Sequence, residues 1–212
     1  MLIEGLDIAT STGFALLDRP GPISAATCGT IYAGDGEAEE KAGHLALQLV
    51  RRYRERKPDF VAIEQPQRNV VMFKKKGKDD LAGKQQKTTI NPNALQLSAL
   101  AGAAVAILDA YRIPWGLIPT NTWRSVYYGK GFVPPVKIIR HRDGRVTRED
   151  DWKQAAINEA RRQHVLLTGD KTAQGDAAEA LAIAICWERC TFVPARHLDA
   201  FKALRTRQAR AA

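Results

Sequence analysis

The stretch LIEGLDIATSTGFALL, from Leu2 to Leu17, decides how the rest of the chain is arranged. It begins as an apolar run of strand-forming residues, breaks into the small polar segment ATSTG at residues 9–13, and resumes as the apolar run FALL. Two such runs separated by a short turn predict a strand followed by an antiparallel return strand. Asp7 lies within the first run, and a carboxylate in a core strand is costly unless its charge is compensated. The rest of the chain must supply that compensation.

The remaining pattern predicts an α/β fold, in which a three-strand antiparallel meander is extended by parallel strands and flanked by helices. The segment 60–64 (FVAIE) is a short apolar run after a helix, which is typical of a buried strand parallel to the first. Further strands are expected at residues 23–32 and 115–118. Helices are expected from about residue 40 to 56, at 91–111, in a short segment containing Trp123 and Arg124, at 150–164 and at 176–189.

Length and composition place the chain among compact, basic proteins. Its 212 residues, 45% of them hydrophobic, suit a single domain with a full core. The net charge of +9 favours a polyanionic partner such as nucleic acid. Glu4 and Asp7 interrupt the apolar start, and the longest apolar run, 99–108, is too short to span a bilayer. We therefore expect a cytoplasmic protein with no membrane association.

Positive charge is concentrated in two segments. Residues 68–87 hold seven Lys or Arg against two Asp and are expected to form a loop, while 131–149 is a second basic segment with a hairpin turning at Asp143-Gly144. Lysines in such loops fix the position of DNA through its phosphates. A merely solvated loop remains the alternative. The residues of the first segment that we expect to contact DNA are Arg68, Lys74, Lys75, Lys76, Lys78, Lys84 and Lys87.

Four acids stand out because each lies in apolar surroundings: Asp7, Glu64, Asp176 and Glu179. Asp176 and Glu179 are expected to open a helix and, three positions apart, to share one of its faces. Four converging carboxylates would repel one another unless divalent cations were bound, and oxygen ligands alone favour Mg²⁺ or Mn²⁺. Each acid by itself also has an ordinary explanation, as a turn, strand-end or helix-surface residue. Two ions about 4 Å apart would suit phosphodiester hydrolysis.

The motifs GLDIATSTGFALL, VAIEQP and GDAAEALAIAICW resemble, in this order, the three acidic motifs of the RuvC-like Holliday junction resolvases. This family belongs to the RNase H-like (retroviral integrase) superfamily. LQLSALAGAAVAIL is similar to the family's long helix, and the resemblance extends from residue 2 to about residue 187. It implies an RNase H-like fold and a homodimeric endonuclease, active in DNA recombination and repair, that nicks two opposing strands of a four-way junction and leaves a 5′-phosphate and a 3′-hydroxyl.

The resemblance also implies roles for individual residues. The ligands of two Mg²⁺ ions, replaceable by Mn²⁺, would be Asp7, Glu64, Asp176 and Glu179. Lys153 would be a further catalytic residue, with a surface ion pair on its helix as the alternative. Phe73 stands where the family carries an aromatic that inserts at the junction, although a simple hydrophobic anchor is the alternative. Lys130 is the counterpart of a family lysine that contacts DNA.

Some features depart from the family pattern. Glu179 stands where an aspartate is frequent, and 131–149 has the character of an insertion, which suggests a divergent phage or mobile-element member. We expect residues 1–190 to form the nuclease domain and 191–212 a basic tail. The alternatives are a broader nuclease for branched or flapped DNA and a non-catalytic DNA-binding module. Sugar kinases and actin-like ATPases share the first motif but need a second such domain.

Overall fold

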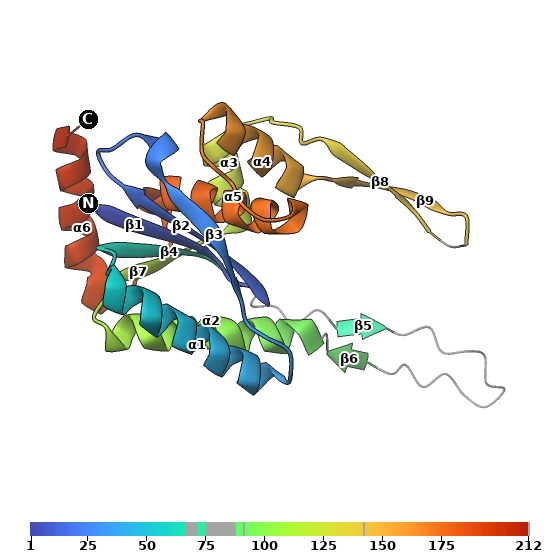
Figure 1. Cartoon of the computed structure of the whole chain (residues 1–212), viewed down its shortest axis with the longest axis horizontal. Helices are drawn as coiled ribbons and strands as arrows, with labels where there is room; N and C mark the ends of the chain where they lie inside the picture. The colour runs from blue at the N-terminus through green and yellow to red at the C-terminus, as the bar shows by residue number, and fades with distance from the viewer. Residues whose placement is uncertain (67–71, 75–87, 91, 142, 212) are drawn as a thin grey trace.

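The computed structural model describes residues 1–66, 72–74, 88–90, 92–141 and 143–211, with side chains described at 1–66, 94–141 and 143–211. These residues form a central five-stranded mixed sheet in the order β3-β2-β1-β4-β7, with helices on both faces (Figure 1). The antiparallel part contains β1 (Leu2–Asp7), β2 (Ser11–Asp18) and β3 (Thr27–Tyr32). The parallel part adds β4 (Phe60–Glu64) and β7 (Trp115–Ile118). This is the α/β architecture that the sequence pattern predicts.

The register places the opening motif at the centre of the sheet. Strand β1 pairs antiparallel with β2, with Asp7 opposite Gly13, and parallel with β4 on its other side. Strand β4 pairs in parallel with β7, with Glu64 opposite Ile118. The carboxyl ends of β1, β4 and β7 therefore meet at one end of the sheet. Residues that follow these strands gather there.

One face of the sheet is covered by α1 (Ala38–Glu55) and α2 (Pro92–Ala110). Helix α1 begins with a capping box between Glu37 and Glu40, which satisfies backbone donors at its first turn. Leu45, Leu49 and Tyr53 of α1 pack with buried residues of α2 and of the sheet. The packing explains the approximate helical spacing of apolar residues in the α1 sequence.

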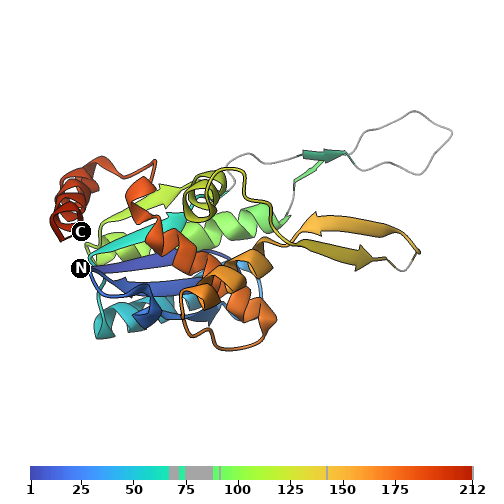
Figure 2. The ribbon, with the colours of Figure 1, turned by 90° about the horizontal axis from the view of Figure 1, so that it is seen from above.

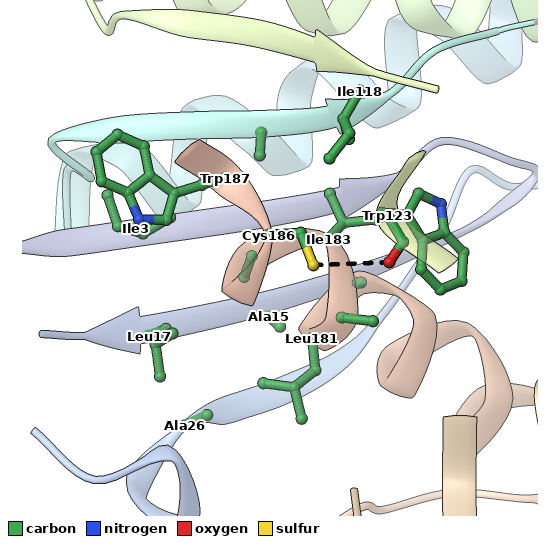
Figure 3. Packing of buried hydrophobic residues seen from close by; sticks show 14 of the residues in the cluster. Ile3, Ala15, Leu17, Ala26, Ile118, Trp123, Leu181, Ile183, Cys186 and Trp187 are labelled. Carbon is green, nitrogen blue, oxygen red and sulfur yellow. Dashed lines mark hydrogen bonds between the residues drawn. The ribbon is translucent and has the colours of Figure 1, made fainter. Parts of the chain in front are cut away.

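The other face carries α5 (Lys171–Ile185) directly on the sheet, with α3 (Thr120–Tyr128) and α4 (Trp152–Arg162) beside it. Figure 3 shows Leu181 of α5 beside Ala15 and Ile183 of α5 beside Ile118, within one buried cluster. The alanines of α5 are buried along most of its length, which lets its backbone lie close to the strands.

The C-terminal segment contains η2 (Trp187–Arg189), η3 (Ala195–His197) and α6 (Leu198–Ala211). The Phe201 ring of α6 packs in a tilted arrangement against Phe60 and edge-on against Trp187, at ring-centroid distances of 5.2 and 5.6 Å. Leu204 joins the same core cluster. Helix α6 therefore packs against the sheet domain at the end opposite to the carboxyl ends of the parallel strands (Figure 1).

Three local expectations are corrected by the structure. The predicted strand 23–32 begins at Thr27, because Ile23–Ala25 form a 3₁₀ turn, η1. The helix predicted at 176–189 begins at Lys171, capped by Asp170, so Asp176 lies in its second turn. The basic segment expected to be a loop contributes β5 (Met72–Lys74), which pairs with β6 (Thr88–Ile90).

The predicted hairpin in the second basic segment is confirmed as β8 (Val136–Arg140) paired with β9 (Val146–Asp150). Figures 1 and 2 both show this hairpin extending away from the helices, at the end of the molecule where β1 and β4 finish. Within the described part of the chain, no helix is long and apolar enough to cross a membrane.

Candidate metal centre

Among the described residues, three carboxylates from distant parts of the sequence meet at one point. Asp7 is the last residue of β1, and Asp176 and Glu179 lie one turn apart on the face of α5 that rests on the sheet. One oxygen from each lies within 4.8 Å of the others. Asp176 and Glu179 are buried, whereas Asp7 is partly exposed. The cluster therefore opens to solvent on the side of Asp7.

Two glycines allow this convergence. A Cβ atom at Gly13 would lie 2.1 Å from the backbone oxygen of Asp176, and one at Gly5 would lie 2.1 Å from the backbone oxygen of Ala180. Real side chains do not tolerate such contacts, so the helix can rest on β1 and β2 only because both positions lack a side chain. The short interstrand turn is held by Thr12, whose Oγ1 donates to the Ala9 carbonyl at 2.7 Å.

The cluster is electrostatically strained without a cation. Burial raises the pKa of Asp7 well above its usual range, and the charges of Glu64, Glu179 and Asp176 raise it further. Burial, together with the charge of Glu64, raises the pKa of Glu179 to about 7. Both effects favour the protonated forms of Asp7 and Glu179 in the metal-free protein.

Glu64 lies outside the three-carboxylate cluster but close enough to influence it. Its Oε1 accepts a short hydrogen bond from the Thr120 hydroxyl, and its Oε2 accepts one from the Trp123 indole at 3.1 Å. Both donors belong to α3, which follows the strand beside Glu64. Helix α3 thereby fixes the orientation of this carboxylate at the edge of the cluster.

Lys153 and Arg124 supply the positive charge next to the acids. The Lys153 ammonium donates a short hydrogen bond to Asp176. Burial alone lowers the pKa of Lys153, but its bond to Asp176 and the surrounding carboxylates outweigh this effect and raise it. The Arg124 guanidinium lies 3.5 Å from Glu179 and 4.3 Å from the centre of the Trp152 ring. The two cations compensate part of the negative charge.

The residues present fit a divalent cation. The donors are all carboxylate oxygens, which Mg²⁺ and Mn²⁺ prefer, and no described histidine or cysteine belongs to the cluster. The carboxylates lie close together, and their mutual repulsion contributes to the raised pKa values of Asp7 and Glu179. A bound cation would remove that repulsion.

Sequence reasoning selected Asp7, Glu64, Asp176, Glu179 and Lys153, and the structure brings all five to one end of the sheet. It missed Thr120, Trp123 and Arg124. A signal was available, because these residues follow β7, whose end lies beside that of β4, and polar residues after neighbouring parallel strands share one edge of a sheet.

The predicted DNA contacts are only partly described. Lys130 is exposed, between two glycines with positive φ angles. Phe73 and Lys74 lie in β5, whose side chains are outside the described set. The remaining predicted contacts lie outside the described residues: Arg68, Lys75, Lys76, Lys78, Lys84 and Lys87.

No family model and no curated protein sequence matches the chain. Among solved structures, Thermus thermophilus RuvC in complex with Holliday junction substrate is similar, with a TM-score of 0.52, 14% identity and coverage of 87% of this chain and 91% of that one. The Thermus thermophilus RuvC structure gives a TM-score of 0.54, 11% identity and coverage of 91% and 98%. The yeast mitochondrial Holliday junction resolvase Ydc2 gives a TM-score of 0.47 and 12% identity, with coverage of 98% of this chain and 85% of that one. The two RuvC structures confirm the RuvC-like, RNase H-like fold expected from the motifs.

Proposed function

We propose that this chain is a metal-dependent endonuclease that resolves four-way DNA junctions by phosphodiester hydrolysis. The observation that carries the proposal is the meeting of Asp7, Asp176 and Glu179 at the end of the sheet, with Lys153 beside them. The RuvC-like fold supports it, since one of the similar structures is RuvC bound to a Holliday junction substrate. The net charge of +9 supports a nucleic-acid partner.

In this proposal Asp7, Asp176 and Glu179 hold Mg²⁺, with Glu64 as a further ligand at the edge of the cluster and Mn²⁺ as a substitute. Bound divalent ions would polarise the scissile phosphate, lower the pKa of water and stabilise the leaving oxygen, as a pair of ions does in other phosphodiester hydrolases. The positions of these carboxylates relative to one another are set by the close packing of α5 against Gly5 of β1 and Gly13 of β2.

The two cationic side chains have separate roles. Lys153 is nearly half exposed and borders the cluster at Asp176, so its ammonium can contact a phosphate oxygen and stabilise the charge that develops there. Arg124 is more buried and is held between Glu179 and Trp152. It orients Glu179, and Thr120 and Trp123 orient Glu64 in the same way.

A four-way junction requires two cuts on opposing strands, and we infer that two copies of the chain act together. Lys130 and the basic segment 68–87 would contact the phosphates of the junction arms. Such contacts fix the position of the DNA without reading its sequence. The proposed biological role is DNA recombination and repair.

The proposal is tested by incubating the protein with a synthetic four-way junction, linear duplex, flap and fork, with Mg²⁺ or with EDTA. We expect Mg²⁺-dependent paired nicks in the junction, with 5′-phosphate and 3′-hydroxyl ends, and much slower cleavage of the other substrates. Cleavage of every branched substrate at the same rate would favour a broader structure-selective nuclease. Absence of cleavage on all of them would refute the enzymatic function.

Matched variants assign the activity to the site. Asp7→Asn should abolish cleavage while leaving the fold intact, because it removes one charge from a repulsive cluster. Asp199→Asn makes the same chemical change at an exposed position on α6 and should leave cleavage unchanged. Equal rates for both variants would show that the cluster is not the active site. Mass measurements with and without junction DNA would test the dimer.

A further inference from the structure

The β8–β9 hairpin has one face that is exposed over its whole length. The register pairs Val136 with Asp150, Ile138 with Arg148, and Arg140 with Val146, so these six side chains share one face. All six are exposed, with Val136, Ile138 and Val146 at 55%, 59% and 58%. On the opposite face, Ile139 and Thr147 are partly buried, and Lys137 and Glu149 are exposed.

An isolated two-stranded hairpin of this kind is marginally stable by itself. Its internal support includes an ion pair at the tip, from Arg145 to Asp143 at 2.6 Å, and a hydrogen bond between His141 and Thr147 at 3.0 Å. Val136, Ile138 and Val146 also expose branched apolar side chains on one face, and their hydration is unfavourable. The exposed face is therefore suited to a partner that accepts apolar and cationic groups together.

Charge identifies the chemistry of that partner. The outer part of the face alternates apolar and cationic side chains, with Ile138 beside Arg148 and Val146 beside Arg140. A second copy of the same face would bring two net positive surfaces together, because each face carries Arg140 and Arg148 against one acid, Asp150. A DNA groove offers phosphates to the arginines and base edges, including thymine methyl groups, to the apolar side chains. A two-stranded β-ribbon fits the major groove, which is about 12 Å wide.

The hairpin is also placed where a DNA arm would pass. Strand β9 ends at Asp150, and α4, which follows at once, carries Lys153 with its ammonium on Asp176. Four steps of about 3.4 Å along β8 carry the ribbon about 14 Å from its base, which equals the rise of about four base pairs. Both views show the ribbon extending outward from that end of the sheet (Figures 1 and 2).

We propose that the face formed by Val136, Ile138, Arg140, Val146, Arg148 and Asp150 enters the major groove of one duplex arm of the DNA. This inference rests on the proposed function for the position of the arm. The contact itself requires only duplex DNA. It would add a major-groove contact with one DNA arm to the phosphate contacts expected from residues 68–87.

The test compares single substitutions on the two faces in the full chain. Arg148→Gln and Ile138→Ser change the exposed face, and Lys137→Gln removes one charge from the opposite face. The dissociation constant of a fluorescent junction, and of a linear duplex, is measured in EDTA over a NaCl series. Arg148→Gln should flatten the slope of log affinity against log salt by about 0.9, Ile138→Ser should weaken binding without changing the slope, and Lys137→Gln should leave the slope unchanged.

A second variant replaces residues 137–149 with a short Gly-Ser turn, which removes no residue of either core cluster. Protection of guanine N7 atoms in the duplex arm against methylation by dimethyl sulfate should disappear, with the melting temperature retained. Equal slopes for Arg148→Gln and Lys137→Gln would overturn the inference. So would an unchanged footprint with a change in mass, which would identify the ribbon as a contact between copies. A wild type that binds duplex as predicted but cleaves no junction would refute the proposed function alone.

Discussion

Raising the pH from about 5 to about 8 should destabilise the metal-free protein through the carboxylate cluster. Burial and the charge of Glu64 raise the pKa of Glu179 to about 7 in the folded chain, against an ordinary value of 4.5. The folded state therefore holds this proton more tightly than the unfolded state. The associated stability is complete below about pH 4.5 and is lost as the pH rises through 7, and a difference of about 2.5 pKa units corresponds to about 3 kcal/mol.

Thermal unfolding in EDTA measures this loss. In a chain of this size 1 kcal/mol shifts the melting temperature by about 2–4 °C, so we expect a fall of about 6–12 °C between the two pH values. Mg²⁺ should reverse most of it at the higher pH, because an ion that binds only the folded state stabilises that state. The glutamine in Glu179→Gln carries no titratable proton. The fall in melting temperature between the two pH values should therefore be about 6–12 °C smaller in this variant. Identical pH dependence in wild type and Glu179→Gln would refute this account of the site.

Three further outcomes follow from individual contacts. Gly13→Ala forces α5 away from β2 and should cost about 3 kcal/mol in urea unfolding, whereas Gly43→Ala, in open space on α1, should be neutral or slightly stabilising. Thr120→Val removes a hydrogen-bond donor to Glu64 and should raise the Mg²⁺ concentration needed for half-maximal cleavage about tenfold. An unchanged concentration would show that this hydrogen bond does not contribute to metal binding. Lys153→Met should slow single-turnover cleavage by about 10²-fold with little change in junction affinity, and a loss of affinity alone would assign it to binding instead.

The sheet was predictable because its strands are short and strongly patterned. The segments 60–64 and 115–118 are apolar on both faces, and the structure shows each as a buried parallel strand with the expected bounds. The start of α5 was harder to place, because its first turn is polar and is followed by Gly175. That glycine has a packing role, since a Cβ there would lie 2.9 Å from the Cβ of Lys153.

Parts of the fold and of the site depend on contacts that a sequence does not display. Glu4 was taken only as a break in an apolar run, yet it is fully buried and paired with Arg52 of α1 at 2.9 Å. Their separation of 48 positions carries no local signal. The grouping of Asp7 with the acids of α5 followed from motif order, whereas the attachment of Glu64 to α3 required the coordinates.

The close contact between α5 and the sheet has a consequence for the choice of ion. No side chain lies between the helix and the strand backbones at Gly5 and Gly13, so side-chain repacking cannot change the distance between them. The spacing between Asp7 and the acids of α5 is thus dictated by backbone atoms in contact. Mg²⁺ needs oxygen distances of about 2.0–2.1 Å and Ca²⁺ about 2.3–2.6 Å. Because the backbones at Gly5 and Gly13 are already in contact with α5, ions of different radius would have to be accommodated by rotation of the Asp7, Asp176 and Glu179 side chains.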